Sequence, residues 1–573
     1  MSRLRDPVTI VLRVSVPESA VREMLAVEGV VSIIVATRSE SLAACYPGRV
    51  GWYLEDEVHW LLPERVAQEM VYVGHPWEFG FRAARSAWRA GIRSFRSLAD
   101  AKQPFLRRTM TRVLTTTLLR SVSYRVHLIP LFGSIEQYSA LNVRWLARKI
   151  ASLERKPLQA VERRIVMVIG GLGAGGSEQQ AVHTLQGLLY IGYTDLALLH
   201  EQPMQPPHDF FVGRLRGTPI AVDQLRPLFL HHPHEWVMDA DFVHIMEAVG
   251  MNSSVCMQIL SYVAEFRVRR PQVVHTWLDS VNVTAGVAAV LAGVPRVVVS
   301  CRSVAPIHFK LYQPHMKPLY RFLASCRNVI LLNNSSAGAK DYCRWLGLNP
   351  DVFRVVHNGF DFSRVPPGDE LERRILELRR RWGVSAVESV VGTVIRLSEE
   401  KRPLLWVEAA AEIASRDQSV KFVILGDGPY RDKVLEAVQR LGLAEKVVLV
   451  GYEADAVSSI AAMDVFLLTS RMEGLPNVLI EAQAVGVAVV TASVGGAPET
   501  FEHGVTGLSV PDANARALAE AVLHLLHHTD LREAARVRAP PLVRDRFGTD
   551  GMLRGVLRTY GFDQRYHEHP HQT

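Results

Sequence analysis

The stretch Arg471-Met-Glu-Gly-Leu-Pro-Asn-Val-Leu-Ile-Glu-Ala-Gln-Ala-Val-Gly486 follows an apolar run and predicts a loop that leads into a helix. Pro476 stands where the helix can begin, because its fixed φ suits the first helical position and its missing N–H is not needed there. Gly486 is expected to end the helix after about three turns, as a glycine just past a helix does. Glu473 then lies in the loop before the helix, and Glu481 lies on the first turns.

The start of this helix is suited to ligand binding. The first amides of a helix have no acceptor one turn earlier, so the N–H groups of Gly474, Asn477 and Val478 are expected to point at a bound anion or a hydroxyl-rich ligand. The two glutamates are less informative, because their spacing alone indicates only a solvated and a helix-face carboxylate. The surrounding sequence decides between these interpretations.

Three further turns follow predicted buried strands. Arg396-Leu-Ser-Glu-Glu-Lys401 follows the strand 390–395, and Leu425-Gly-Asp-Gly-Pro429 follows the strand 421–424. A third turn, Gly495-Gly-Ala-Pro-Glu499, comes after the run 487–491. Open parallel sheets bind their ligands at the carboxyl ends of their strands, so these turns are expected to form one site.

The amino half carries a second glycine loop. Residues 164–169 read as a buried strand, Gly170–Gly176 form the loop, and Ser177 is a natural cap for a helix to about residue 189. Such a loop lets backbone amides approach a phosphate closely. The next strand ends in His200 rather than in an acidic residue, which argues against NAD. Val356-His-Asn-Gly-Phe-Asp361 marks the crossing into a second domain.

Taken together, these motifs make residues 163–560 resemble a retaining glycosyltransferase of family 4. The resemblance also includes Asp464, and it is the order and spacing of the motifs that make it strong. It implies an α/β protein of the GT-B fold, in which two Rossmann-like domains face a central cleft. The expected divisions are an extension at 1–160, an acceptor domain at 161–365, a nucleotide-sugar domain at 366–545, and a closing helix with its tail at 546–573.

The resemblance also assigns roles to residues. Glu473, Arg396 and Lys401 are the expected catalytic residues: the two cations stabilise the leaving diphosphate, and Glu473 orients the sugar. No metal, cofactor or protein nucleophile is implied. The expected donor-binding residues are Glu481, Gly474, Leu475, Pro476, Asn477, Val478, Gly426 and Gly428, and the expected phosphate loop contains Gly173, Gly175 and Gly176.

The acceptor side is less defined. His275 ends the predicted strand 273–277, where it either contacts a substrate or simply closes a strand. Arg302 follows the strand 297–301, in a loop that also holds Lys310, Lys317 and Arg321. That loop suits an anionic acceptor, and it equally suits a solvated surface. Relatives often carry a second histidine where this chain has Trp277 or Arg302, so the residue that supports the acceptor hydroxyl is left open.

Composition limits the remaining alternatives. Five scattered cysteines without a CxxC pair indicate reduced thiols, and the amino terminus has no apolar export signal. We therefore expect a cytoplasmic protein. His231-His-Pro-His234 lacks metal-ligand spacing and is interpreted as a polar loop. Asp239-Ala-Asp241 precedes a predicted helix rather than ending a strand, so it is not taken as a metal site.

The extension is the basic part of the chain. Residues 8–14 and 30–37 read as strands around a helix at 18–27, and the pattern turns helical from about 79 to 156. Residues 82–125 contain eleven basic residues and one acid. Such a stretch is typical either of a segment that binds the anionic inner face of the cell membrane or of a solvated helix face. Nucleic acid is not expected, because no binding motif accompanies the charge.

The predicted activity is transfer of a sugar from a nucleotide-sugar donor to a glycan or lipid-linked acceptor, in the synthesis of a bacterial surface polysaccharide. The long extension resembles that of transferases from Vi-type capsule loci. This implies a UDP-linked N-acetylhexosamine or N-acetylhexosaminuronic acid as donor, and capsule-assembly proteins as partners. Two alternatives stay open: a nucleotide-sugar 2-epimerase of the same fold, and a catalytically silent scaffold in a capsule assembly complex.

Overall fold

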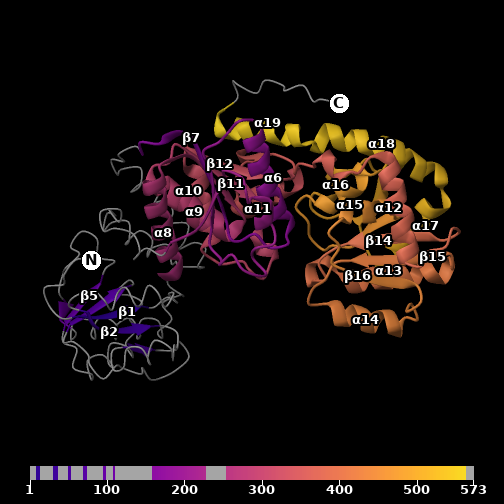
Figure 1. Ribbon diagram of the computed structural model, residues 1–573, viewed down its shortest axis with the longest axis horizontal. Coiled ribbons are helices and arrows are strands. Elements are labelled where there is room, and N and C mark those ends of the chain that lie inside the picture. The colour runs from indigo at the N-terminus through magenta and orange to yellow at the C-terminus, as the bar shows by residue number, and fades with distance from the viewer. Residues whose placement is uncertain are drawn as a thin grey trace.

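The computed structural model describes residues 158–226 and 253–562, together with the backbone of six short strands before residue 110. These strands form a small sheet at one end of the molecule. Two larger domains follow, and the last two described helices run along both (Figure 1). Among the described residues, no helix is long and apolar enough to cross a membrane.

The first sheet has the strand order β3-β2-β1-β4-β5-β6 and is parallel except for its last pair. Strands β1 (Val8–Leu12) and β2 (Val30–Val35) confirm the two predicted strands. The other strands are β3 (Val50–Trp52), β4 (Glu69–Val73), β5 (Ser94–Ser97) and β6 (Arg108–Thr109). A wholly helical pattern from residue 79 is therefore wrong, because β5 and β6 lie within it. The expected helix at 18–27 and the side chains of 82–125 lie outside the described residues.

The second sheet has seven parallel strands in the order β13-β12-β11-β10-β7-β8-β9. Its central strands are buried over most of their length, as expected for strands covered on both faces. The strands are β7 (Val161–Ile169), β8 (Leu196–His200), β9 (Ala221–Gln224), β10 (Pro271–Trp277), β11 (Arg296–Cys301), β12 (Val329–Asn333) and β13 (Phe353–Val355).

Alternation along β7 divides the core of this domain in two. Val166 and Val168 pack against α8 (Ser253–Arg269), α9 (Asp279–Ala292), α10 (Met316–Ser325) and α11 (Ser336–Leu346). Ile165, Met167 and Ile169 face the opposite side and pack against α6 (Gly176–Tyr190). That second face also receives Leu553, Val556 and Tyr560 from the far end of the chain.

The third sheet has six parallel strands in the order β16-β15-β14-β17-β18-β19. They are β14 (Ser389–Val394), β15 (Val420–Leu425), β16 (Val447–Gly451), β17 (Val465–Leu468), β18 (Ala488–Ala492) and β19 (Gly507–Val510). Six helices pack on it: α12 (Gly368–Arg381), α13 (Pro403–Arg416), α14 (Arg431–Arg440), α15 (Ala456–Ala461), α16 (Asn477–Ala484) and α17 (Ala515–His527).

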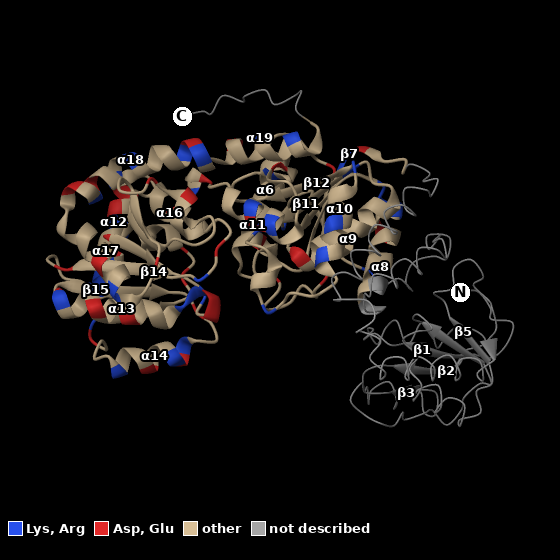
Figure 2. Ribbon diagram, turned by 180° about the vertical axis from the view of Figure 1, so that it is seen from behind, with Lys and Arg blue, Asp and Glu red and all other residues tan. Residues whose placement is uncertain are grey.

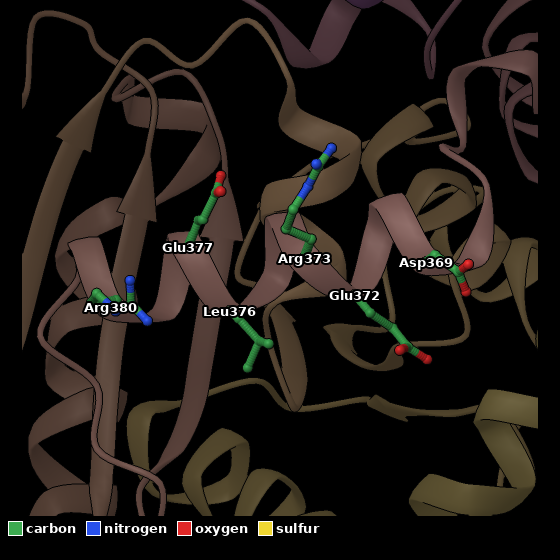
Figure 3. A pocket seen from close by; sticks show the side chains of 6 residues that line it. All are labelled: Asp369, Glu372, Arg373, Leu376, Glu377 and Arg380. Carbon is green, nitrogen blue, oxygen red and sulfur yellow. The ribbon is translucent and has the colours of Figure 1, made fainter.

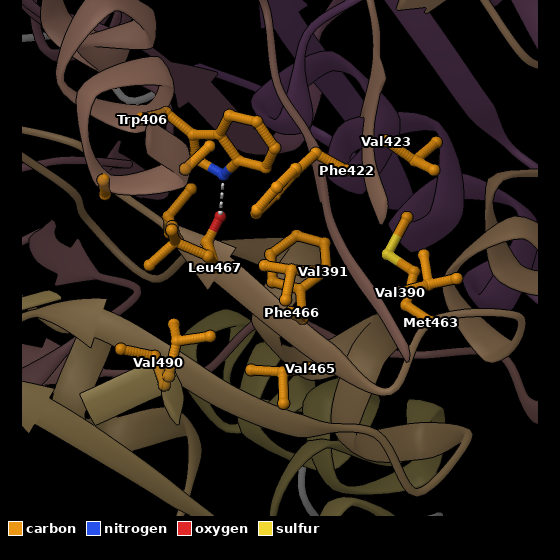
Figure 4. Packing of buried hydrophobic residues seen from close by; sticks show 14 of the residues in the cluster. Val390, Val391, Trp406, Phe422, Val423, Met463, Val465, Phe466, Leu467 and Val490 are labelled. Atoms are coloured by element: carbon orange, nitrogen blue, oxygen red, sulfur yellow. Dashed lines mark hydrogen bonds between the residues drawn. The ribbon is translucent and has the colours of Figure 1, made fainter. Parts of the chain in front are cut away.

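The core of this domain joins α13 to the central strands. Trp406 is fully buried and donates its indole N–H to the carbonyl oxygen of Leu467, at 3.1 Å (Figure 4). Its ring packs edge-on against Phe422, with the centroids 6.2 Å apart. The order of strands reverses between β14 and β17, and in the second sheet between β7 and β10. Ligands bind at such reversal points in open sheets, at the carboxyl ends of the strands.

The chain returns to the first of these two domains at its end. Helix α18 (Thr529–Phe547) packs on α16, and α19 (Thr549–Tyr560) packs on α6. The expected closing helix at 544–560 is therefore two helices, with an extended residue, Gly548, between them. The β-carbon that an alanine would add at Gly187 in α6 would lie 2.9 Å from the side chain of Leu553, so the two helices are in close contact.

Candidate functional site

The predicted catalytic residues lie on loops that leave the carboxyl ends of the third sheet. Arg396 follows β14, Lys401 ends the short helix Glu399–Lys401, and Glu473 lies in the loop after β17. Figure 2 shows both basic and acidic segments on the loops of this domain that face the preceding one. The parallel pairing of β14 with β17 brings these two strand ends together.

Lys401 and Glu473 form an ion pair. The ammonium nitrogen Nζ lies 2.6 Å from Glu473 Oε1, and Glu473 is only 7% exposed. Arg402, next to Lys401, fixes the start of the loop that carries Glu473, because its Nε donates to the Thr469 carbonyl at 2.6 Å. A buried carboxylate needs such a partner. The lysine ammonium has three donors, so it can contact Glu473 and a ligand oxygen at the same time.

Glu481 is paired as well, with a residue that the sequence motifs did not indicate. Arg364, on the segment that joins the two large domains, donates from Nη1 to Glu481 Oε1 at 2.9 Å. Glu481 is 5% exposed. Arg214 of the preceding domain also lies near this pair: burial is the main cause that lowers its pKa, Arg364 lowers it further, and Glu481 acts to raise it.

Arg396 is exposed and faces the preceding domain. Its charge acts on Glu178, which lies in the first turn of α6. Burial raises the pKa of the Glu178 carboxyl above its ordinary value, and a backbone hydrogen bond and Arg396 only partly oppose this. Arg396 and Lys401 are thus both at the domain boundary, but only Lys401 contacts one of the two predicted glutamates.

The start of α16 leaves free amides. Among the described residues, the backbone N–H groups of Gly474, Asn477 and Val478 have no hydrogen-bond acceptor. The helix begins at Asn477, one residue later than predicted. Pro476 precedes it in extended conformation. The helix is also shorter than expected, with eight residues, although Gly486 follows it as predicted, with φ of +75°. The first of these amides belongs to Gly474, which directly follows Glu473 of the Lys401–Glu473 pair.

The side chain of Leu475 does not face this site. It is buried in a small cluster with Phe360 of the linking segment, Ile480 of α16, and Val543 and Phe547 of α18. Only the backbone of Leu475 is therefore available to a ligand. The cluster anchors the loop, because its members come from the linking segment, α16 and α18.

Three glycines are required by close backbone approach. A β-carbon on Gly474 would lie 2.3 Å from the Arg302 carbonyl oxygen, across the domain boundary. One on Gly426, where φ is +121°, would lie 1.9 Å from the Ile395 carbonyl. Gly428 is similar, with φ of +156° and Leu397 O at 2.6 Å. Only glycine fits such positions.

The predicted phosphate loop lies opposite, in the preceding domain. Gly175 is the N-cap of α6 and Gly176 is its first residue, so the predicted cap, Ser177, is wrong: that serine lies inside the helix. Gly173 is three residues before the helix and packs under the backbone of Pro207. Asn477 connects the two loops, since its Nδ2 donates to the Gly176 carbonyl at 3.2 Å.

Of the two predicted acceptor residues, His275 is buried and Arg302 is half-buried. His275 is 1% exposed, and its Nδ1 lies 2.7 Å from the hydroxyl of Tyr560 in α19. Burial, with a smaller contribution from Arg302, lowers the pKa of His275 to about 3. The returning helix covers His275, as expected for a histidine that closes a strand, and an acceptor role for it stays a prediction. The Arg302 guanidinium stacks over Trp277, with its carbon 4.3 Å from the ring centroid, and donates to Asn358 of the linking segment.

Glu499 is a second residue that sequence reasoning passed over. Its carboxylate accepts from the amides of Ser336 and Ala337, at 2.9 and 2.7 Å, where α11 begins in the other domain. Burial acts to raise the pKa of Glu499, but His357 and the two amides outweigh it and lower the pKa overall. The sequence showed Glu499 only as the end of a glycine turn, and nothing in it identified α11 as the partner.

A shallow hollow of about 500 Å³ lies elsewhere, along α12. It is lined by Asp369, Glu372, Arg373, Leu376, Glu377 and Arg380 (Figure 3). All six come from one surface helix, so the hollow contains none of the predicted site residues. His231–His234 and Asp239–Asp241 lie outside the described residues.

Comparison with known proteins identifies the family. Residues 375–540 match the model for glycosyl transferases group 1, and residues 239–364 match the model for glycosyltransferase family 4. The Vi polysaccharide biosynthesis protein VipC/TviE of Salmonella typhi is 32% identical over 420 residues, which cover 70% of this chain and 72% of that protein. The chain belongs to glycosyltransferase family 4.

Other relatives of this family 4 glycosyltransferase match a smaller part of it. The UDP-Gal:alpha-D-GlcNAc-diphosphoundecaprenol alpha-1,3-galactosyltransferase of Escherichia coli is 30% identical over 261 residues, which cover 43% of this chain and 64% of that enzyme. Among solved structures, Anabaena Alr3699/HepE in complex with UDP and glucose aligns with a TM-score of 0.56 at 21% identity. It covers 69% of this chain and 99% of that one. The predicted GT-B fold is confirmed.

Proposed function

We propose that this protein is a retaining glycosyltransferase that moves a sugar from a UDP-linked donor onto a growing bacterial surface polysaccharide. The observation that carries the proposal is the anion-binding arrangement at the domain boundary. Free amides lie at Gly474 and at Asn477 and Val478, the first two residues of α16, and Gly474 directly follows Glu473, which pairs with Lys401. A leaving nucleoside diphosphate is the ligand that such an arrangement suits, because amides and fixed cations stabilise developing phosphate charge.

In this mechanism each half of the donor has its own partners. Arg396, Lys401 and the amides of α16 bind the diphosphate, and the glycine loop at the start of α6 approaches it from the other domain. Glu481 holds the ribose, and Arg364 keeps that carboxylate in place. Glu473 orients the sugar hydroxyls and stabilises positive charge at the anomeric carbon.

The bond changes balance without a protein nucleophile. The bond between the anomeric carbon and the β-phosphate oxygen breaks, and the acceptor hydroxyl oxygen forms the new bond on the same face. The acceptor proton passes to the leaving diphosphate oxygen. The anomeric configuration is thereby retained.

Relatives support the choice of donor and product class. The E. coli relative is named for a UDP-galactose donor, and the HepE structures hold UDP. The S. typhi relative is named for Vi polysaccharide biosynthesis, which supports a polysaccharide product. We propose an N-acetylhexosamine or its uronic acid as the sugar and a capsular polysaccharide as the product. We place the enzyme in the cytoplasm. The basic stretch 82–125 is proposed to attach it to the anionic inner face of the membrane.

The test is donor turnover across a panel of UDP-sugars, with wild type, Glu473→Gln and Lys401→Ala. Both variants should lose at least about 100-fold in kcat/KM, as when oxyanion-stabilising groups are removed. Glu412→Gln, on the exposed face of α13, is the matched control and should behave as wild type. Unchanged turnover in both site variants would overturn the site assignment. Epimerised UDP-sugar without transfer would indicate the 2-epimerase, and absence of both binding and turnover would indicate the scaffold.

A further inference from the structure

Asn358 lies on the segment between β13 and Phe362, where the chain crosses from one large domain to the other. It is 3% exposed. A buried amide is costly unless its donors and acceptors are satisfied, so its partners show what it holds in place.

All four hydrogen-bonding capacities of the Asn358 amide are used. Its Oδ1 accepts from Arg302 Nη2 and, at 3.4 Å, from Asn334 Nδ2. Its Nδ2 donates to the Leu475 carbonyl at 2.8 Å and to Asn477 Oδ1 at 2.6 Å. An arginine can only donate and a carbonyl can only accept, so these partners fix which end of the amide carries the oxygen.

The bonds continue into the preceding domain. Asn477 Nδ2 donates to the carbonyl of Gly176, and its Oδ1 also accepts from Gln180 Nε2 at 3.4 Å. Gln180 is itself 3% exposed and holds Gly359, next to Asn358, through both of its amide atoms, at 2.8 and 2.9 Å. The network therefore runs from Arg302 through the linking segment to α16, and back to the start of α6.

We infer that Asn358 is a positioning residue that sets the Gly474–Asn477 loop against the start of α6, and so fixes the spacing of the two halves of the donor site. This inference rests on the proposed function for the meaning of the site, and on the hydrogen bonds alone for the positioning. Asn358 touches neither the proposed cations nor the glutamates. It holds the loop by a backbone carbonyl and a side-chain oxygen, while the other end of the same amide is tied to Arg302.

Aspartate separates this role from simple packing, because it has the size of asparagine but cannot donate. In Asn358→Asp the bond to Arg302 can persist, whereas the oxygen that replaces Nδ2 faces both Leu475 O and Asn477 Oδ1 and is repelled by them. We expect kcat to fall at least about 30-fold and the Kd for UDP to rise by a smaller factor, because the contacts that UDP makes within the third-sheet domain are intact and only those from the start of α6 are displaced. Asn328→Asp is the control: it loses one donor to the Val294 carbonyl, 2.8 Å away, far from the domain boundary. It should keep wild-type kcat.

Small-angle X-ray scattering gives a second readout that needs no activity. With UDP present, Asn358→Asp should have a larger radius of gyration than wild type and Asn328→Asp, because one of the links between the two domains is lost. If Asn358→Asp does not fold, Gln180→Glu breaks the same network from α6 and should give the same pair of changes. Wild-type kcat and wild-type scattering in the folded variant would overturn the inference. A wild type that turns over no UDP-sugar would instead defeat the proposed function, and scattering would still decide the positioning.

Discussion

Gly474→Ala tests how closely the two domains must approach. The added β-carbon would lie 2.3 Å from the Arg302 carbonyl oxygen and 2.8 Å from Ser303 Cα, both backbone atoms of the other domain. Real β-carbons essentially never come within 3.0 Å of such atoms, so the loop must move by at least 3.0 − 2.3 = 0.7 Å. Alanine keeps the amide N–H and needs no unusual φ here. Crowding is therefore the main effect of the substitution.

The functional cost should exceed the cost in stability. A movement of this size lengthens the 2.8 Å bond from Asn358 to Leu475 O to about 3.5 Å, beyond the ordinary range. Misplacing reacting groups by about 1 Å can cost roughly 100-fold in rate, so we expect kcat to fall by about that factor. The free energy of unfolding should change by about 1 kcal/mol or less, because the contact joins two domains and fills no core.

The assay is UDP release from the preferred UDP-sugar, with urea unfolding measured in parallel. Gly368→Ala, at the first residue of α12, is the matched control, because its added β-carbon meets nothing within 4 Å. A Gly474→Ala protein as active as this control would refute the reasoning that the rate depends on this approach of the domains.

Four further outcomes follow from buried charged and polar groups. Lys401→Met leaves the Glu473 carboxylate without its cation and should lower the free energy of unfolding in urea by about 1–3 kcal/mol, less than for a fully buried pair because the lysine is 26% exposed. Adding Glu473→Gln should restore most of this loss. A double variant no more stable than the single variant would contradict the prediction. Because the folded pKa of Glu178 is raised, its ionisation opposes folding as pH rises above about 4.3. Glu178→Gln should therefore gain stability over wild type between pH 4 and pH 7. A stability difference that does not change with pH would count against this prediction. Since the pKa of His275 is lowered to about 3, this group should reduce the free energy of unfolding by about 2 kcal/mol between pH 7 and pH 5, where the unfolded histidine binds a proton. His275→Gln should make the stability depend less on pH over this range. An unchanged pH dependence would place the titration in another group. Tyr560→Phe, which removes the hydroxyl that meets this ring, should cost about 1–2 kcal/mol in thermal unfolding with little change in kcat, and a large loss of activity would argue that the ring faces a substrate after all.

Much of the second large domain could be predicted from sequence, because its apolar strands, glycine turns and helices alternate regularly. The nearness of Lys401 to Glu473 follows from the same regularity, since parallel strands end at one edge of a sheet. The predicted cap of α6 was wrong because Ser177 and Gly175 are both acceptable helix starts, and only the packing against the loop before α16 decides between them.

Contacts across the domain boundary could not be predicted. Arg364 reaches Glu481, and Glu499 reaches the start of α11, only because two separately folded domains are placed side by side. No local pattern encodes that placement. The sequence left the role of His275 open for a related reason: a histidine at a strand end looks the same whether a substrate or a distant helix covers it, and here Tyr560 returns to cover it.

The return of α19 has a consequence for synthesis of the protein. One face of the second sheet is completed by Met552, Leu553, Val556 and Tyr560, which the ribosome adds only after the whole third sheet. The earlier domain therefore leaves the ribosome with an uncovered apolar face and an exposed histidine. Its final fold has to wait for its neighbour, so a ribosome that stalls within α18 would release a chain prone to aggregation rather than a working half.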